Sequence, residues 1–176
     1  MKNNKNLLIV AGLAALLGLF LYLSKKKVDT KTAGRDESNG QSSSSGGSTT
    51  RGIKNNNPFN IRYSAINKWK GLTGSDGSFC VFENMKYGIR AGGVLLRNYL
   101  KNGNNTIEKI ITKFAPAEDG NNTANYIKHV AQMSGINQST VLSVSELWRV
   151  ARPMMYIESR YNATDSDKDC FDNKNI

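Results

Sequence analysis

Histidine and cysteine are scarce in this sequence, with one histidine and two cysteines among 176 residues. A lone His129 excludes a histidine-rich metal site, and we expect neither a metal ion nor a cofactor. Cys80 and Cys170 lie far apart in the sequence. They are compatible with a disulfide in an oxidising compartment and equally with two free thiols.

Acidic residues are also few, since 14 Asp and Glu stand against 24 Lys and Arg, for a formal net charge of +10. A basic protein suits an anionic polymer such as nucleic acid or cell wall. No basic stripe interleaved with aromatic residues stands out in the sequence. We therefore do not expect nucleic acid as a partner.

Charge is absent from residues 7–23, LLIVAGLAALLGLFLYL, a run long enough to span a bilayer. Lysines precede the run, and a lysine cluster follows it at residues 25–27. No small-x-small cleavage site follows, which favours an uncleaved anchor over a signal peptide. No cysteine lies near the run, so nothing supports a lipoprotein. Residues 1–27 are thus predicted to form an N-terminal membrane anchor with one transmembrane helix.

Residues 28–50 contain almost no apolar side chains and include a Ser/Gly-rich stretch. They are predicted to be a flexible linker, because such a composition cannot bury a core. Globular composition begins at Arg51, and we expect a catalytic domain over residues 51–162. Residues 163–176 are polar and acidic, and we expect them to form a tail over the surface.

The periodicity of the domain predicts a mainly α (α+β) fold with a small β-hairpin. One strand of the hairpin is expected at residues 78–82, after a turn-rich segment. A capping box beginning at Ser143 starts the last helix, in which Pro153 is expected to introduce a kink. Helices are predicted over residues 87–101, 106–114, 122–133 and from 143 to about 160.

Glu158 lies near the end of the last predicted helix, within MMYIESRYN. At 100° per residue it falls within about 20° of Leu147 and Ala151, on the apolar face. Desolvation raises the pKa of a carboxyl group there, as a general acid requires. The alternative is a structural ion pair between Glu158 and Arg152 or Arg62. Glu83 is a second candidate acid, although its place before a helix favours a role at the helix N-terminus.

The loop RGIKNNNPFNIRY, residues 51–63, carries amide side chains that can donate and accept hydrogen bonds. Its asparagines, including Asn57 and Asn60, either hold the backbone of the loop or bind the hydroxyl and acetamido groups of a sugar. Trp69 is either a core residue or a flat surface for a sugar ring. The sequence alone leaves both pairs of alternatives open.

Three stretches resemble the lytic transglycosylase branch of the lysozyme superfamily. IESRYN at residues 157–162 resembles the motif that carries the catalytic glutamate. Residues 84–100 resemble a segment whose helix packs beside the active site. Residues 122–130 resemble the late tyrosine motif. Here the glutamate motif comes last instead of first, as a circular permutation of the fold would give. The NNNP loop resembles the opening of phage-associated wall-degrading proteins, with Phe59 where glycine is expected.

The resemblance implies a lysozyme-like fold and cleavage of the MurNAc-GlcNAc bond of peptidoglycan during entry or lysis. Glu158 would be the catalytic acid, and Asn57, Asn60, Tyr126 and Trp69 would bind substrate. The partners would be peptidoglycan, the virion membrane or bacterial inner membrane, and other virion proteins. The competing hypothesis is a non-catalytic virion or envelope protein that binds peptidoglycan.

Overall fold

The computed structural model describes residues 49–173, which form a mainly helical unit with one two-stranded antiparallel sheet. The predicted mixture of helices and a small β element is therefore confirmed. The helices are α2 Arg51–Lys54, α3 Met85–Lys101, α4 Ile107–Phe114, α5 Thr123–Ser134, α6 Leu147–Ser159 and α7 Asp167–Phe171. The strands are β1 Leu72–Ser75 and β2 Cys80–Phe82, and short 3-10 turns cover Ala117–Asp119 and Val144–Glu146.

Within residues 49–173, no helix has both the length and the apolar character needed to cross a bilayer. The anchor predicted at residues 7–23 lies outside the described part of the chain. So does most of the linker predicted at residues 28–50. Thr50 itself belongs to the folded unit, because its hydroxyl donates to the carbonyl of Ser159 at 2.7 Å.

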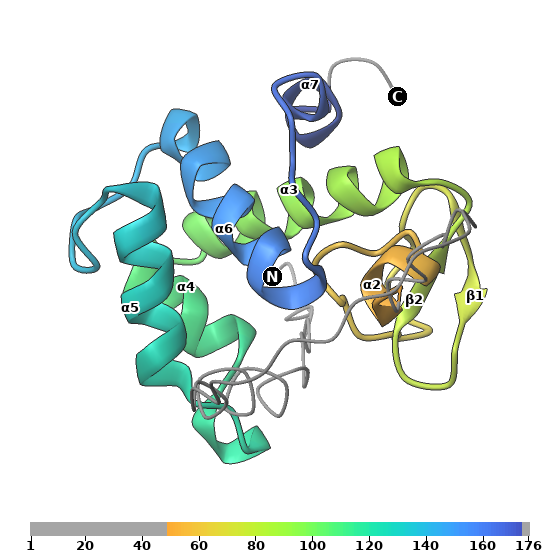
Figure 1. The fold of residues 1–176 in the computed structure, drawn as a ribbon, viewed down its shortest axis with the longest axis horizontal. Helices are drawn as coiled ribbons and strands as arrows, with labels where there is room; N and C mark the ends of the chain where they lie inside the picture. Colours follow the sequence, from red (N-terminus) through yellow and green to blue (C-terminus); the bar gives the residue numbers. More distant parts are fainter. Residues whose placement is uncertain (1–48, 174–176) are drawn as a thin grey trace, which may run out of the picture.

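Helix α6 occupies the middle of the fold and packs against α5, α3 and α2. Figure 1 shows α4 and α5 on one side of α6, with α2 and the β-hairpin on the other. Helix α2, from the start of the folded unit, therefore meets α6, which lies near its C-terminal end. The buried residues of α6 cover a face broader than a single stripe, so the helix packs against elements on more than one side.

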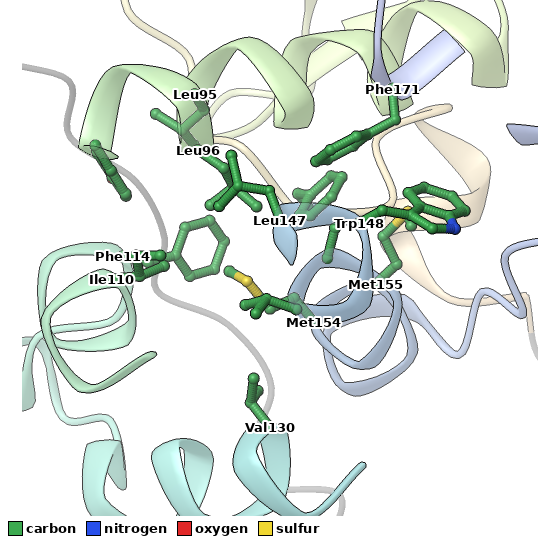
Figure 2. Close-up of a cluster of buried hydrophobic side chains, with 14 of the residues drawn as sticks. Leu95, Leu96, Ile110, Phe114, Val130, Leu147, Trp148, Met154, Met155 and Phe171 are labelled. Atoms are coloured by element: carbon green, nitrogen blue, oxygen red, sulfur yellow. The ribbon is translucent and has the colours of Figure 1, made fainter. Parts of the chain in front are cut away.

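The core gathers apolar side chains from α3, α4, α5, α6 and α7 (Figure 2). Phe114 and Tyr126 meet edge to face with ring centroids 6.4 Å apart, and Trp148 lies 5.2 Å from Phe171. Burial of such residues is the main favourable contribution to folding. Those labelled in Figure 2 are Leu95, Leu96, Ile110, Phe114, Val130, Leu147, Trp148, Met154, Met155 and Phe171.

Capping hydrogen bonds occur at the helix starts predicted at residues 106 and 143, the second of which opens the 3-10 turn before α6, whereas α3 has no side-chain cap. Thr106 accepts a hydrogen bond from the amide of Lys109 at 3.2 Å before α4. The Glu146 carboxylate accepts from the amide of Ser143 at 2.8 Å, as the capping box requires. Pro153 lies inside α6, which continues to Ser159. The helix continues through the proline, and the kink expected at Pro153 stays a prediction.

The C-terminal segment differs from the predicted surface tail. Residues 167–171 form α7, which packs on α3, and Phe171 is only 1% exposed. Arg97 donates to the carbonyl of Phe171 at 2.8 Å. Burial of this one aromatic side chain thus holds the polar C-terminal segment against the core. Cys170 is buried there, and both it and Cys80 are free thiols.

The hairpin pairs Leu72 with Phe82 and Ser75 with Cys80. Its first strand, β1, lies in the segment predicted only as turn-rich, because Gly and Ser predominate there. The second strand agrees with the predicted position to within two residues. The hairpin holds the asparagine loop, since the amide of Phe82 donates to the carbonyl of Asn55 at 2.9 Å.

Two glycines allow the asparagine loop and α2 to approach the helices. A Cβ on Gly92 of α3 would lie 2.1 Å from the ring of Phe59. The large side chain at the unusual position of the NNNP loop therefore occupies space that Gly92 leaves free. A Cβ on Gly52 of α2 would lie 2.5 Å from the Cβ of Ser159. Both contacts require glycine, and the second places α2 against the end of α6.

Candidate active site at the end of helix α6

Glu158 lies in the last turn of α6 and is 6% exposed. Asn60 Nδ2 donates to the backbone carbonyl of Glu158 at 2.9 Å and to its Oε2 at 3.2 Å. Asn60 adopts φ 47°, a left-handed conformation that asparagine tolerates better than most residues. This backbone conformation turns the loop so that one of its amides faces the carboxyl group.

Burial raises the pKa of Glu158 from 4.5 to about 7, against the lowering effect of hydrogen bonds from Asn60 and Tyr126. No ion pair to Glu158 occurs within residues 49–173. The structural alternative of an ion pair is therefore wrong for both named partners. Arg152 lies 4.0 Å from Asp165, and the Arg62 guanidinium lies over the ring of Phe79. A carboxyl group of this kind is close to half protonated at neutral pH.

Tyr126 reaches the same carboxyl group from the first turns of α5. Its side chain is 3% exposed, and burial first and Glu158 second raise its pKa well above 10. The hydroxyl has no hydrogen bond of regular geometry to any described residue, yet it lies close enough to Glu158 to lower the pKa of that carboxyl. Tyr126 is thus a neutral, buried neighbour whose hydroxyl acts on the carboxyl group of Glu158.

The other asparagines of the loop brace its backbone. Asn57 is fully buried, donates to the carbonyls of Ile61 and Cys80 at 3.0 Å, and accepts from the amide of Ile61 at 2.9 Å. All its amide functions are used within the fold, which favours the alternative in which Asn57 holds the backbone of the loop. Asn55 donates to Asp76 at 2.7 Å and Asn56 to the carbonyl of Phe82 at 3.0 Å. These contacts tie the loop to the hairpin.

Ser159 contributes to the site without having been singled out from the sequence. Its hydroxyl donates to the carbonyl of Pro58 at 2.9 Å, while its own carbonyl accepts from Thr50. The loop, α2 and the end of α6 are thereby fixed to one another. A small polar residue directly after the buried glutamate was the available signal for this role.

Trp69 and Glu83, two other candidate site residues, lie in surroundings different from those of Glu158. Trp69 is half-buried and packs against the core, and its indole nitrogen has no hydrogen-bond partner within residues 49–173. This packing favours the structural interpretation of the ring. Glu83 is exposed and precedes α3, as expected for an acid near a helix N-terminus. Neither residue shares the buried surroundings of Glu158.

Two cavities lie away from this carboxyl group. One of about 750 Å³ lies beside α5 and α6, and another of about 900 Å³ lies beside α4. Glu158 lines neither. In the part of the chain that the structure describes, no group of three or more His, Cys, Asp or Glu residues could hold a metal ion.

Comparison with known proteins gives two matches. A family model described as the LPXTG cell wall anchor motif matches residues 2–30. Those residues contain no proline, so the pentapeptide itself is absent and the match covers the apolar run with its flanking lysines. Protein P5 of Pseudoalteromonas phage PM2 is 38% identical over 117 residues, which cover 64% of this chain and 72% of that protein.

The 117 residues aligned in the second match are more than the N-terminal anchor and linker segments, residues 1–50, contain. The similarity therefore includes part of the folded unit that carries Glu158. At this identity and coverage, the chain belongs to the family of Protein P5 of Pseudoalteromonas phage PM2.

Proposed function

We propose that this protein cleaves the MurNAc-GlcNAc bond of peptidoglycan, with Glu158 as the general acid. The observation that carries the proposal is a buried carboxyl group with a pKa of about 7 and no cationic partner within the described residues. A group that is protonated in a substantial fraction of molecules at neutral pH can give its proton to a leaving oxygen. The resemblance of IESRYN to a catalytic glutamate motif supports the same assignment.

The reaction begins when the protonated carboxyl of Glu158 donates to the glycosidic oxygen and the bond to the muramyl C1 breaks. The substrate's own acetamido group supports the developing positive charge, so a second carboxylate is not required. Glu158, now ionised, accepts the proton of the attacking hydroxyl. If that is the muramyl hydroxymethyl group, an anhydro ring forms; if it is water, the product is a reducing sugar.

Asn60 and Tyr126 hold the acid during these steps. Both lower the pKa of Glu158, because each stabilises the ionised carboxylate left after proton donation. Asn60 Oδ1 is buried without a partner among residues 49–173 and is free to accept from a sugar. Because only 6% of Glu158 is exposed, neighbouring side chains must separate for the substrate to reach it.

The place of action follows from the two matches and the N-terminal sequence. A relative from a phage and a match to a cell wall anchor motif support a virion-associated or cell-surface protein. The apolar run at residues 7–23 would hold the protein in a virion membrane or bacterial inner membrane. Residues 28–48 would then give the folded unit its reach to the wall.

The test compares Glu158→Gln with the wild-type protein for turbidity loss of purified peptidoglycan. Gln keeps the size of Glu but cannot donate a carboxyl proton, so activity should fall by about a hundredfold or more. Glu83→Gln is the matched control, since it makes the same change at an exposed acid. Full activity of Glu158→Gln, or a loss confined to Glu83→Gln, would reject the assignment. An inactive wild type that still binds the wall would favour the non-catalytic hypothesis.

A further inference from the structure

The cavity of about 750 Å³ lies on the side of α6 away from Glu158. At 100° per residue, Arg149, Arg152 and Tyr156 point between about 120° and 180° round the helix from Glu158. The cavity is therefore separate from the candidate active site. Its lining comprises Met133, Ser134, Trp148, Arg149, Arg152, Pro153, Tyr156, Tyr161, Asn162, Ala163 and Asp165.

Two arginines and one aspartate line the cavity, so the formal net charge of its lining is +1. Arg149 uses one guanidinium nitrogen to donate to the carbonyl of Ser134 at 2.8 Å, which fixes its position. Arg152 lies 4.0 Å from Asp165, whose side chain is 95% exposed, and such a solvated pair contributes little. Guanidinium donors thus remain available to carboxylate groups.

Trp148 supplies a second, independent observation. Its side chain is 6% exposed, and its indole nitrogen has no hydrogen-bond partner within residues 49–173. Figure 2 shows this nitrogen at the edge of the indole that faces away from the other labelled side chains. A buried donor without an acceptor is costly, and an acceptor on a ligand in the cavity would satisfy it.

We propose that this cavity binds the carboxylate-bearing stem peptide that peptidoglycan carries on muramic acid. The inference rests on the proposed function, because it places the peptide of the same substrate whose sugar reaches Glu158. Two arginines and an indole N–H suit carboxylate and carbonyl acceptors, and the rings of Tyr156 and Tyr161 suit the apolar parts of a peptide.

The separation of Arg152 and Glu158 along the axis of α6 is within reach of a short peptide. Arg152 precedes Glu158 by six residues, which corresponds to about 9 Å along the helix axis. An extended peptide spans at most about 3.6 Å per residue, so three or four residues can pass round the end of α6. Tyr161 and Asn162 line the cavity and directly follow that end, and so provide a path between the sites.

The test measures binding of the stem tripeptide L-Ala-γ-D-Glu-meso-diaminopimelate to the full-length protein by titration calorimetry. Arg152→Ala and Trp148→Phe should each raise Kd by about tenfold, because each removes one donor to the peptide. Arg152 is half exposed, so its variant keeps the fold. Lys128→Ala removes an exposed cation of α5 outside the cavity and should leave Kd unchanged.

Three outcomes would overturn the proposal: no binding of the tripeptide to wild type, an unchanged Kd in Arg152→Ala, or equally tight binding of a linear L-glutamyl peptide. The last result would assign the cavity to an acidic protein segment. Glu158→Gln separates the two proposals, since it should bind the tripeptide normally while losing wall cleavage. Normal tripeptide binding by a wild type that cleaves no wall would reject the proposed function and keep the binding site.

Discussion

At the residue scale, the raised pKa of Glu158 makes the stability of the protein depend on pH. The folded state binds a proton up to about pH 7, whereas the unfolded chain releases it near 4.5. Unfolding free energy therefore falls as pH rises from 4.5 to 7 and levels off above 7. The full difference corresponds to about 3 kcal/mol, at about 1.4 kcal/mol per pKa unit.

Glu158→Gln should remove the loss of stability that ionisation of the buried Glu158 carboxyl causes at high pH. We predict that the variant is more stable than wild type by up to about 3 kcal/mol at pH 8, with no such gain at pH 4. Urea unfolding at the two pH values measures the difference. A gain of equal size at both pH values would show that ionisation of Glu158 is not its cause.

Tyr126→Phe should raise the pKa of Glu158 further. The hydroxyl of Tyr126 lowers that pKa, and phenylalanine retains the ring that packs on Phe114. Titration of the Glu158 carboxyl by carbon NMR measures the shift. A lower pKa in the variant would mean that the hydroxyl does not stabilise the ionised carboxylate. Ile127→Val, at a neighbouring half-buried position, serves as the control.

Sequence reasoning located Glu158 because helical spacing alone places it among apolar residues. It could not separate Asn57 from Asn60, since both are amides in the same loop. The difference is tertiary: Asn57 meets carbonyls of Ile61 and Cys80, whereas the left-handed backbone of Asn60 turns its amide toward Glu158. The catalytic role of Glu158 stays a prediction.

At the element scale, α3 supports the site by allowing the asparagine loop to lie against it. Gly92→Ala should place a methyl group 2.1 Å from the ring of Phe59 and cost about 1–3 kcal/mol. Gly74→Ala is the matched control, because nothing lies within 4 Å of a Cβ there. Thermal unfolding of the two variants measures the contrast. Equal stabilities would show that Phe59 can move aside without cost.

Elements with strong periodicity were predictable and those without it were not. Helix α4 followed from apolar residues at i, i+3, i+4 and i+7, which are all buried. Strand β1 has little β-forming composition and depends on pairing with β2. Helix α7 was missed because five residues with one buried aromatic ring give no periodic signal.

At the scale of the whole molecule, the C-terminal segment completes the core. Phe171→Ala should lower the unfolding free energy by about 3–5 kcal/mol, because the ring packs on Trp148 and is 1% exposed. Val141→Ala, at a residue 68% exposed, should change it by less than about 0.5 kcal/mol. Chemical denaturation measures both. A small effect of Phe171→Ala would restore the interpretation of residues 163–176 as a surface tail.

The candidate site combines segments from the beginning and the end of the folded unit. Residues 50–60 and the end of α6 lie about a hundred positions apart in sequence and are joined by hydrogen bonds of Thr50, Asn60 and Ser159. The predicted meeting of the asparagine loop with Glu158 agrees with this arrangement. Which groups contact a substrate depends on the sugar chain, which the sequence does not describe.

Mass spectrometry of the soluble products from purified peptidoglycan shows directly whether Glu158 cleaves the glycan strand. We expect the wild-type protein to release disaccharide peptides and the Glu158→Gln variant to release none. An anhydro product, lighter by one water, would identify a transglycosylase, and a reducing sugar a muramidase. Release of peptides from uncut glycan strands, or the same disaccharide products from Glu158→Gln, would contradict cleavage by Glu158.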